Sequence, residues 1–162
     1  MRKPLPTTAR LSPDEEDNYF VRASIREKLR DTTGALADYD RAIKLKPDYS
    51  SAYSNRGAIK CELYNYKGAL ADFDKAIQLD NKNVTAYANR AQLRLITSDY
   101  KGSVADYTKA IALSPDMPMA YFNRGRAKEY LKDLPGAEAD YKKAMEMDPD
   151  YKTRYKEVKA RR

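Results

Sequence analysis

Apolar residues recur along this chain at the spacing of an amphipathic helix, and short polar segments separate the apolar stretches. In residues 67–79, Leu70, Phe73 and Ile77 follow that spacing and should face neighbouring helices. The same pattern returns throughout the chain and predicts a series of helices joined by short connections. The expected helices span residues 13–29, 33–45, 50–63, 67–79, 84–97, 101–113, 118–131 and 135–147.

The helical pattern is itself repeated every 34 residues. The stretch Ala-Tyr-Ala-Asn-Arg-Ala at 86–91 has close copies at 52–57 and 120–125, and a weaker copy at 18–23. A second block, Ala-Leu-Ala-Asp-Phe at 69–73, has relatives at 35–39, 103–107 and 137–141. A fixed period of this length is the signature of a solenoid, in which each unit packs only on its neighbours.

The repeat resembles the unit of the tetratricopeptide repeat (TPR) family. That unit has an aromatic residue at position 4, a small residue at 8, Ala at 20, an aromatic at 24, Ala at 27 and Pro at 32. In the fourth repeat these positions hold Tyr121, Gly125, Ala137, Tyr141, Ala144 and Pro149. The resemblance implies an all-α, right-handed superhelical solenoid of helix–turn–helix units.

Counting from these anchors divides the chain into six segments. We expect a flexible leader at 1–11, a first repeat with an N-terminal extension at 12–49, repeats at 50–83, 84–117 and 118–151, and a basic C-terminal capping helix or tail at 152–162. Tyr155 lies 34 residues after Tyr121, so the last segment begins like a fifth repeat. It either covers the end of the solenoid or is the start of a longer array.

Two positions depart from the family pattern and carry charge in all four repeats. Position 7, usually Leu, is Arg, and position 23 is Asp. Because the guanidinium fork can bind a carboxylate with two hydrogen bonds, we expect structural ion pairs within a repeat or between adjoining repeats. The residues concerned are Arg22, Arg56, Arg90 and Arg124 with Asp38, Asp72, Asp106 and Asp140.

A third departure lies in the turn between the two helices of each repeat. The family has Gly there, but this chain has Arg30, Tyr64, Ser98 and Lys132. Asp or Asn follows each of them directly, at Asp31, Asn65, Asp99 and Asp133. These short polar side chains can supply the turn by bonding to the nearby backbone.

The net charge of +7 resides mostly at the C-terminus. Residues 16–151 carry 22 Lys and Arg against 21 Asp and Glu, whereas residues 152–162 alone have a net charge of +5. A dedicated nucleic-acid surface is therefore not expected, although the tail could contact polyanions non-specifically. No apolar run is long enough for a membrane span, and Cys61 is the single cysteine, so we expect a cytoplasmic protein.

The sequence contains no recognisable catalytic or metal centre. His is absent, and neither a Cys cluster nor a glycine-rich phosphate loop replaces it. We therefore expect a non-catalytic protein with no cofactor and no metal. Its partner should be another protein or a peptide.

The resemblance places the binding surface on the concave side, which the first helix of each repeat lines. Position 6 is Asn in three repeats, and one amide can bind both the C=O and the N–H of a peptide unit. This row resembles the asparagine ladder in the repeat domain of O-linked N-acetylglucosamine transferase. The alternative is that these side chains bond neighbouring helices or water. The expected groove residues are Asn55, Asn89, Asn123, Phe20, Gln92, Phe122, Arg126, Met119 and Tyr130.

The sequence therefore favours a protein-interaction module that holds an extended peptide or a partner helix. The carboxylate clamp by which some family members hold chaperone tails is not expected, because of its residues only Asn89 is present in register. The alternative function is structural: self-association through the terminal repeat faces, or membership of a longer TPR array.

Overall fold

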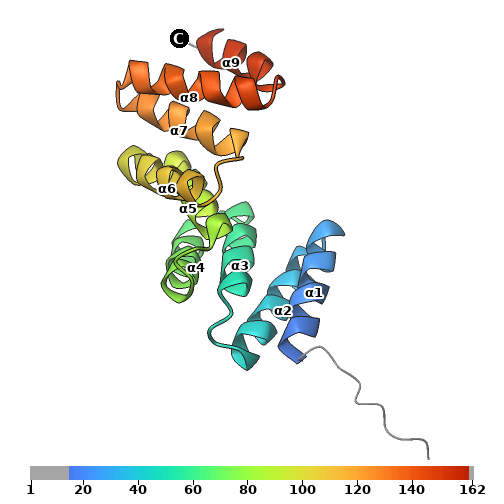
Figure 1. Cartoon of the computed structure of the whole chain (residues 1–162). Coiled ribbons are helices and arrows are strands. Elements are labelled where there is room, and N and C mark those ends of the chain that lie inside the picture. The colour runs from blue at the N-terminus through green and yellow to red at the C-terminus, as the bar shows by residue number, and fades with distance from the viewer. Residues whose placement is uncertain (1–14, 161–162) are drawn as a thin grey trace, which may run out of the picture.

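A computed structural model describes residues 15–160, and these residues form nine α-helices with no strand between them (Figure 1). The expected leader at 1–11 lies outside the described residues. The helices are α1 (Glu15–Lys28), α2 (Thr32–Leu45), α3 (Ser50–Glu62), α4 (Tyr66–Leu79), α5 (Val84–Ile96), α6 (Tyr100–Leu113), α7 (Pro118–Tyr130), α8 (Leu134–Met147) and α9 (Tyr151–Ala160).

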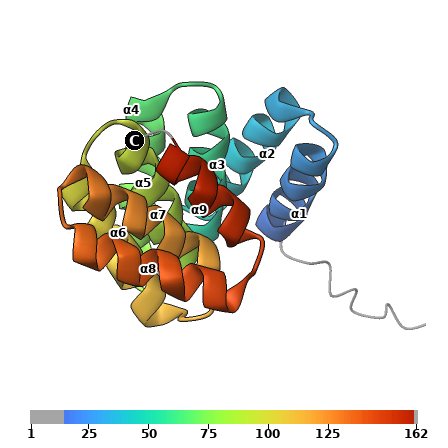
Figure 2. The same cartoon turned by 90° about the horizontal axis from the view of Figure 1, so that it is seen from above.

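The helices form four antiparallel pairs that follow one another along the chain, as the sequence predicts. Each pair consists of a first helix (α1, α3, α5 or α7, the A helices) and a second (α2, α4, α6 or α8, the B helices). Figures 1 and 2 show successive pairs turned relative to one another; each B helix contacts the A helix that follows it, and α5 also contacts both α3 and α7. Each repeat thus buries its apolar surface against the next one.

Small and aromatic residues at fixed positions make up the core of every repeat. The small residues at positions 20 and 27 are fully buried, and so are the aromatic rings at position 24. Gly57 brings α3 close to Phe73: a Cβ placed on Gly57 would lie 2.7 Å from the ring edge. The buried residues at positions 24 and 27 are Tyr39, Phe73, Tyr107 and Tyr141 with Ala42, Ala76, Ala110 and Ala144.

The turn inside each repeat has a left-handed residue that is not glycine. Arg30, Tyr64, Ser98 and Lys132 have φ between 60° and 66°. The residue after each one caps the following B helix; for example, the Asp99 carboxylate accepts a hydrogen bond of 3.0 Å from the Gly102 N–H. The predicted capping of each B helix by Asp or Asn is therefore present. The residue before each cap has a left-handed backbone conformation, which is strained for any residue that carries a Cβ.

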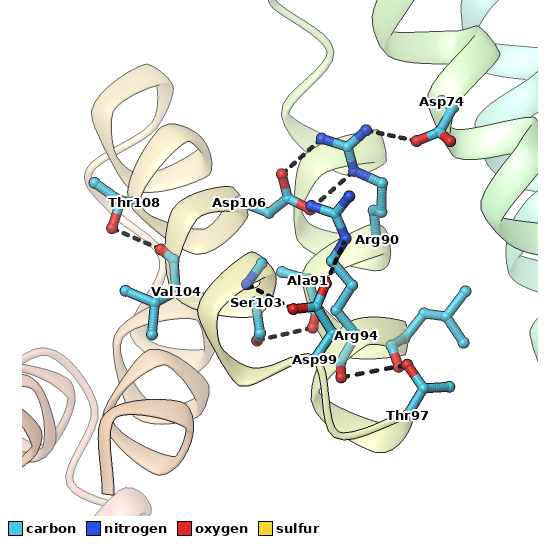
Figure 3. Close-up of polar contacts among 12 residues, drawn as sticks. Asp74, Arg90, Ala91, Arg94, Thr97, Asp99, Ser103, Val104, Asp106 and Thr108 are labelled. Carbon is cyan, nitrogen blue, oxygen red and sulfur yellow. Dashed lines mark hydrogen bonds and ion pairs between the residues drawn. The ribbon is translucent and has the colours of Figure 1, made fainter. Parts of the chain in front are cut away.

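The Arg and Asp residues at positions 7 and 23 form paired hydrogen bonds within each repeat (Figure 3). Arg90 Nε and Nη2 donate to the two oxygens of Asp106 at 2.8 and 2.7 Å. A second cation, Arg94 from the next turn of α5, reaches the same carboxylate at 2.7 Å. Arg22–Asp38, Arg56–Asp72 and Arg124–Asp140 repeat this two-bond geometry.

The same arginines also join neighbouring repeats. Arg90 Nη1 donates to Asp74 of α4 at 2.6 Å, and Arg56 Nη1 donates to Asp40 of α2 at 2.7 Å. Burial opposes the charged form of Arg56, but the hydrogen bonds to Asp72 and Asp40 outweigh it and raise the guanidinium pKa. In the second, third and fourth repeats one arginine therefore links its own B helix to the B helix before it.

The helix α9 lies beside α8 at the C-terminal end of the array (Figure 1). Its Tyr151 ring packs 5.1 Å from Phe122, and its Tyr155 ring packs 5.2 Å from Tyr141. Tyr155 and Lys159 also bond to Glu138 of α8. These contacts cover the outer apolar side of the fourth repeat, as an A helix of a fifth repeat would.

Candidate functional site

The three position-6 asparagines occupy equivalent places on α3, α5 and α7, and we call the side of these helices that bears them the A-helix groove. Their side chains have different environments. Asn55 is half-buried, and its Nδ2 donates to the Tyr39 hydroxyl at 3.0 Å. Asn123 is 8% exposed, and its Nδ2 donates to Gln92 Oε1 at 3.0 Å. Two of the three amides therefore hold neighbouring repeats together.

The partners of these two amides lie in the preceding repeat: the Tyr39 hydroxyl for Asn55 and Gln92 for Asn123. Position 24 is Tyr39 in the repeat before that of Asn55, and Tyr107 in the repeat before that of Asn123. The Tyr107 hydroxyl donates to Gln92 Oε1 at 2.9 Å, the same oxygen that Asn123 uses. Gln92 thus connects a B-helix hydroxyl to the amide of the next repeat.

Asn89 differs because position 24 of the preceding repeat is Phe73, which has no hydroxyl. Within residues 15–160, no hydrogen bond of the half-buried Asn89 amide is found. This amide borders a cavity of about 130 Å³. The cavity is lined by Ala58, Cys61, Phe73, Asn89, Gln92, Leu93 and Ile96. An apolar hollow with an unengaged amide at its edge suits a side chain and the peptide unit that bears it.

Cys61 forms part of this apolar lining. Burial, reinforced by the nearby Glu62 carboxylate, raises the pKa of the Cys61 thiol to about 11. The thiol therefore stays protonated at neutral pH and contributes a small apolar surface to the cavity rather than a nucleophile.

A second hollow, of about 270 Å³, lies between α7 and α9. We call it the C-terminal hollow. It brings three of the predicted groove residues together with three residues of α9. The residues lining it are Phe122, Asn123, Arg126, Arg154, Glu157 and Val158.

The other predicted groove residues differ in burial: one packs in the core and two are exposed. Phe20 stacks on Tyr49 with ring centroids 4.8 Å apart and packs in the core of the first repeat. Met119 and Tyr130 are 45% and 55% exposed, and the Tyr130 ring stacks on Tyr100 at 4.5 Å. Neither cavity described above includes these three residues.

Sequence reasoning missed the contributions of Phe73 and of α9 to this surface. A signal for Phe73 was present: it is the one Phe in a series of Tyr, and it lines the cavity with Ala58, at a position where the other repeats have a polar residue. The side chains of Arg154 and Val158 could not be placed from the repeat pattern, because Val158 occupies the position that is Arg in the four repeats.

Within residues 15–160 there is no cluster of His, Cys, Asp and Glu suited to a metal ion. None of the described helices combines the length and the apolar character that crossing a lipid bilayer requires.

These features define a helical-repeat solenoid of paired α-helices. The chain belongs to the tetratricopeptide repeat family. Sequence profiles described as "TPR repeat" and "Tetratricopeptide repeat" match residues 31–63, 84–117 and 118–151. Members of this family generally mediate protein–protein interactions and are typically non-catalytic.

Solved structures with the same architecture support this assignment. The Arabidopsis OM64 TPR domain is 30% identical, with a TM-score of 0.68, and the match covers 71% of this chain and 95% of that one. MamA from Desulfovibrio magneticus RS-1 is 20% identical, with a TM-score of 0.73, covering 88% and 80%. A further MamA structure is 19% identical, with a TM-score of 0.74, covering 83% and 73%. A comparison with curated protein sequences finds no match.

Proposed function

We propose that this protein is an interaction module that binds an extended peptide, or a partner helix, in the A-helix groove through Asn55, Asn89 and Asn123. The observation that carries the proposal is the unengaged amide of Asn89 beside an apolar cavity. Buried or half-buried amides are normally hydrogen-bonded, so this one is suited to a ligand. Because Asn55 and Asn123 already bond neighbouring repeats, Asn89 should contribute most.

The groove on either side of Asn89 offers further polar and apolar contacts. Gln92 lines the cavity beside Asn89, and its Oε1 is fixed by two hydrogen bonds, one from Tyr107 in the same repeat and one from Asn123 in the next. An amide held in this way loses little conformational entropy when a ligand binds. The apolar lining supplies the buried surface from which most of the affinity should come.

Replacing Asn89 with alanine should weaken peptide binding about tenfold, because the ligand loses hydrogen bonds to a half-buried amide. Stability should change little, since no bond between repeats is removed. Linear twelve-residue peptides selected from a random display library with the wild-type protein would serve as probes, and their affinities would be measured by fluorescence anisotropy.

The matched control is Asn81→Ala, which removes an exposed asparagine from the connection between α4 and α5. It should leave binding unchanged. Failure to select any groove-binding peptide, or equal affinities for the Asn89→Ala and wild-type proteins, would contradict the proposal. A loss of stability comparable to a core truncation would show instead that Asn89 is structural.

Assembly through the outer face of α1 is the second candidate function. Ile25 on this face is 52% exposed, whereas its equivalents Ile59, Leu93 and Ala127 are at most 3% exposed, because a preceding repeat covers them. Head-to-tail stacking of two copies is disfavoured, however. The equivalent of Asp40 in the last repeat is Lys142, which would lie opposite Arg22, and α9 already packs on α8.

Light scattering over a hundredfold range of concentration separates the two candidates. A peptide-binding module should keep a constant mass. A mass that rises with concentration, and that Ile25→Asp returns to the monomer value, would favour assembly through α1.

A further inference from the structure

The C-terminal hollow contains two guanidinium groups that lack an anionic partner. Most arginines within residues 15–160 form an ion pair with Asp or Glu. Arg126 and Arg154 form neither an ion pair nor a hydrogen bond among the described residues, and both line this hollow. The guanidinium carbon of Arg154 does lie over the Tyr151 ring, 4.9 Å from the ring centroid. The two charges therefore face one space without an ion pair to either of them.

Of the other lining residues, Phe122 and Val158 are apolar and Asn123 is already oriented. The Phe122 ring is 5% exposed and is wedged between Tyr141 and Tyr151, each 5.1 Å away. Val158 adds a second apolar surface from α9. Asn123 is held by its bond to Gln92, so its amide has a fixed direction. A rigid apolar floor beneath two free guanidinium groups is suited to a ligand that is partly apolar and partly anionic.

We propose that the C-terminal hollow binds the carboxylate side chain of an Asp or Glu residue in a peptide, with a neighbouring apolar side chain on Phe122 and Val158. Arg126 and Arg154 donate hydrogen bonds to the carboxylate oxygens. The proposal rests on the proposed function, since it identifies which peptides the A-helix groove accepts. Charge complementarity and the apolar floor together select this chemistry over a neutral or a basic segment.

Glu157 limits how much negative charge the hollow accepts. Its carboxylate lines the same space as the two arginines, but no ion pair joins it to either one. A single carboxylate is attracted by two positive charges and repelled by one negative charge. A run of adjacent acidic residues would bring further carboxylates towards Glu157. The expected ligand therefore has one acidic residue beside an apolar residue rather than a polyacidic segment.

The carboxylate requirement can be tested with the peptides selected for the groove. Those with the highest affinity should contain an acidic residue next to an apolar one. Changing that acid to its amide, Asp to Asn or Glu to Gln, should weaken binding to the wild-type protein about tenfold. Against the double variant Arg126→Gln/Arg154→Gln, the acidic and amide peptides should bind equally. The variant Glu157→Gln should bind the acidic peptide more tightly than the wild-type protein does.

Arg30→Gln is the matched control, because Arg30 is also an arginine without an ion pair among the described residues but lies at the other end of the array. It should retain the full preference for the acidic peptide. Thermal unfolding should be the same for all variants, since none removes a bond between repeats.

The outcomes separate this inference from the proposed function. Peptides whose binding depends on Asn89 but not on the acidic residue or the two arginines would overturn the inference and leave groove binding intact. A preference that survives in the double variant, or that requires a free peptide C-terminus instead of an acidic side chain, would also overturn it. Selection of no peptides at all would overturn both.

Discussion

Replacing Arg90 with methionine should lower the free energy of unfolding by about 3 kcal/mol, because it removes one partner from a buried ion pair. Asp106 is 4% exposed and loses two hydrogen bonds, although Arg94 still reaches it. The link to Asp74 of the preceding repeat is lost as well (Figure 3). Urea unfolding followed by circular dichroism measures the change.

The equivalent change in the first repeat, Arg22→Met, is the matched control. The Arg22 side chain is 54% exposed, against 15% for Arg90, and among residues 15–160 it hydrogen-bonds only to Asp38. Its replacement should cost much less than that of Arg90. Equal losses at the two positions would show that the bond between repeats contributes nothing and that the pair within the repeat accounts for the whole effect.

Replacing Gly57 with leucine should destabilise the protein by about 3 kcal/mol, because it overpacks the contact between α3 and α4. The first carbon of any side chain already meets Phe73 at 2.7 Å and Asp72 Cβ at 3.2 Å. The rest of a leucine would have to displace a fully buried ring. The measurement is again the free energy of unfolding in urea.

Gly57→Ala tests the same position with the smallest side chain. The third repeat has Ala91 at this place, fully buried and packed with Tyr107, so the array can accommodate one methyl group there. Gly57→Ala should therefore change stability by less than about 1 kcal/mol, since better helix propensity offsets the crowding. A loss with alanine as large as that with leucine would mean that backbone geometry, not side-chain volume, requires glycine.

The fold could be predicted from the sequence because one 34-residue pattern is written four times. Each copy places small residues where two helices approach and an aromatic ring between them. A position that is ambiguous in one copy can therefore be interpreted from the equivalent positions of the other three. The helix ends were predictable for the same reason: Asp31, Asn65, Asp99 and Asp133 all stand at the turn and cap the next helix.

The differences between the three asparagines could not be predicted from the repeat alone. Asn55, Asn89 and Asn123 look equivalent in sequence, but their partners come from the preceding repeat, 16 or 31 residues away. The partners that Tyr39 and Gln92 provide to the other two amides are replaced by Phe73 and Ala58 in the repeat before Asn89, so its amide is unengaged. The C-terminal hollow could not be predicted either, because it forms between α7 and α9, and α9 departs from the repeat pattern.

The central claim is that the Asn89 amide contacts a bound peptide. The most direct measurement is the nitrogen–proton correlation spectrum of the asparagine side-chain amides during titration with a selected peptide. The Asn89 resonances should shift and saturate with the measured affinity, while those of Asn81 stay in place. Saturated binding with the Asn89 resonances unmoved would contradict the claim.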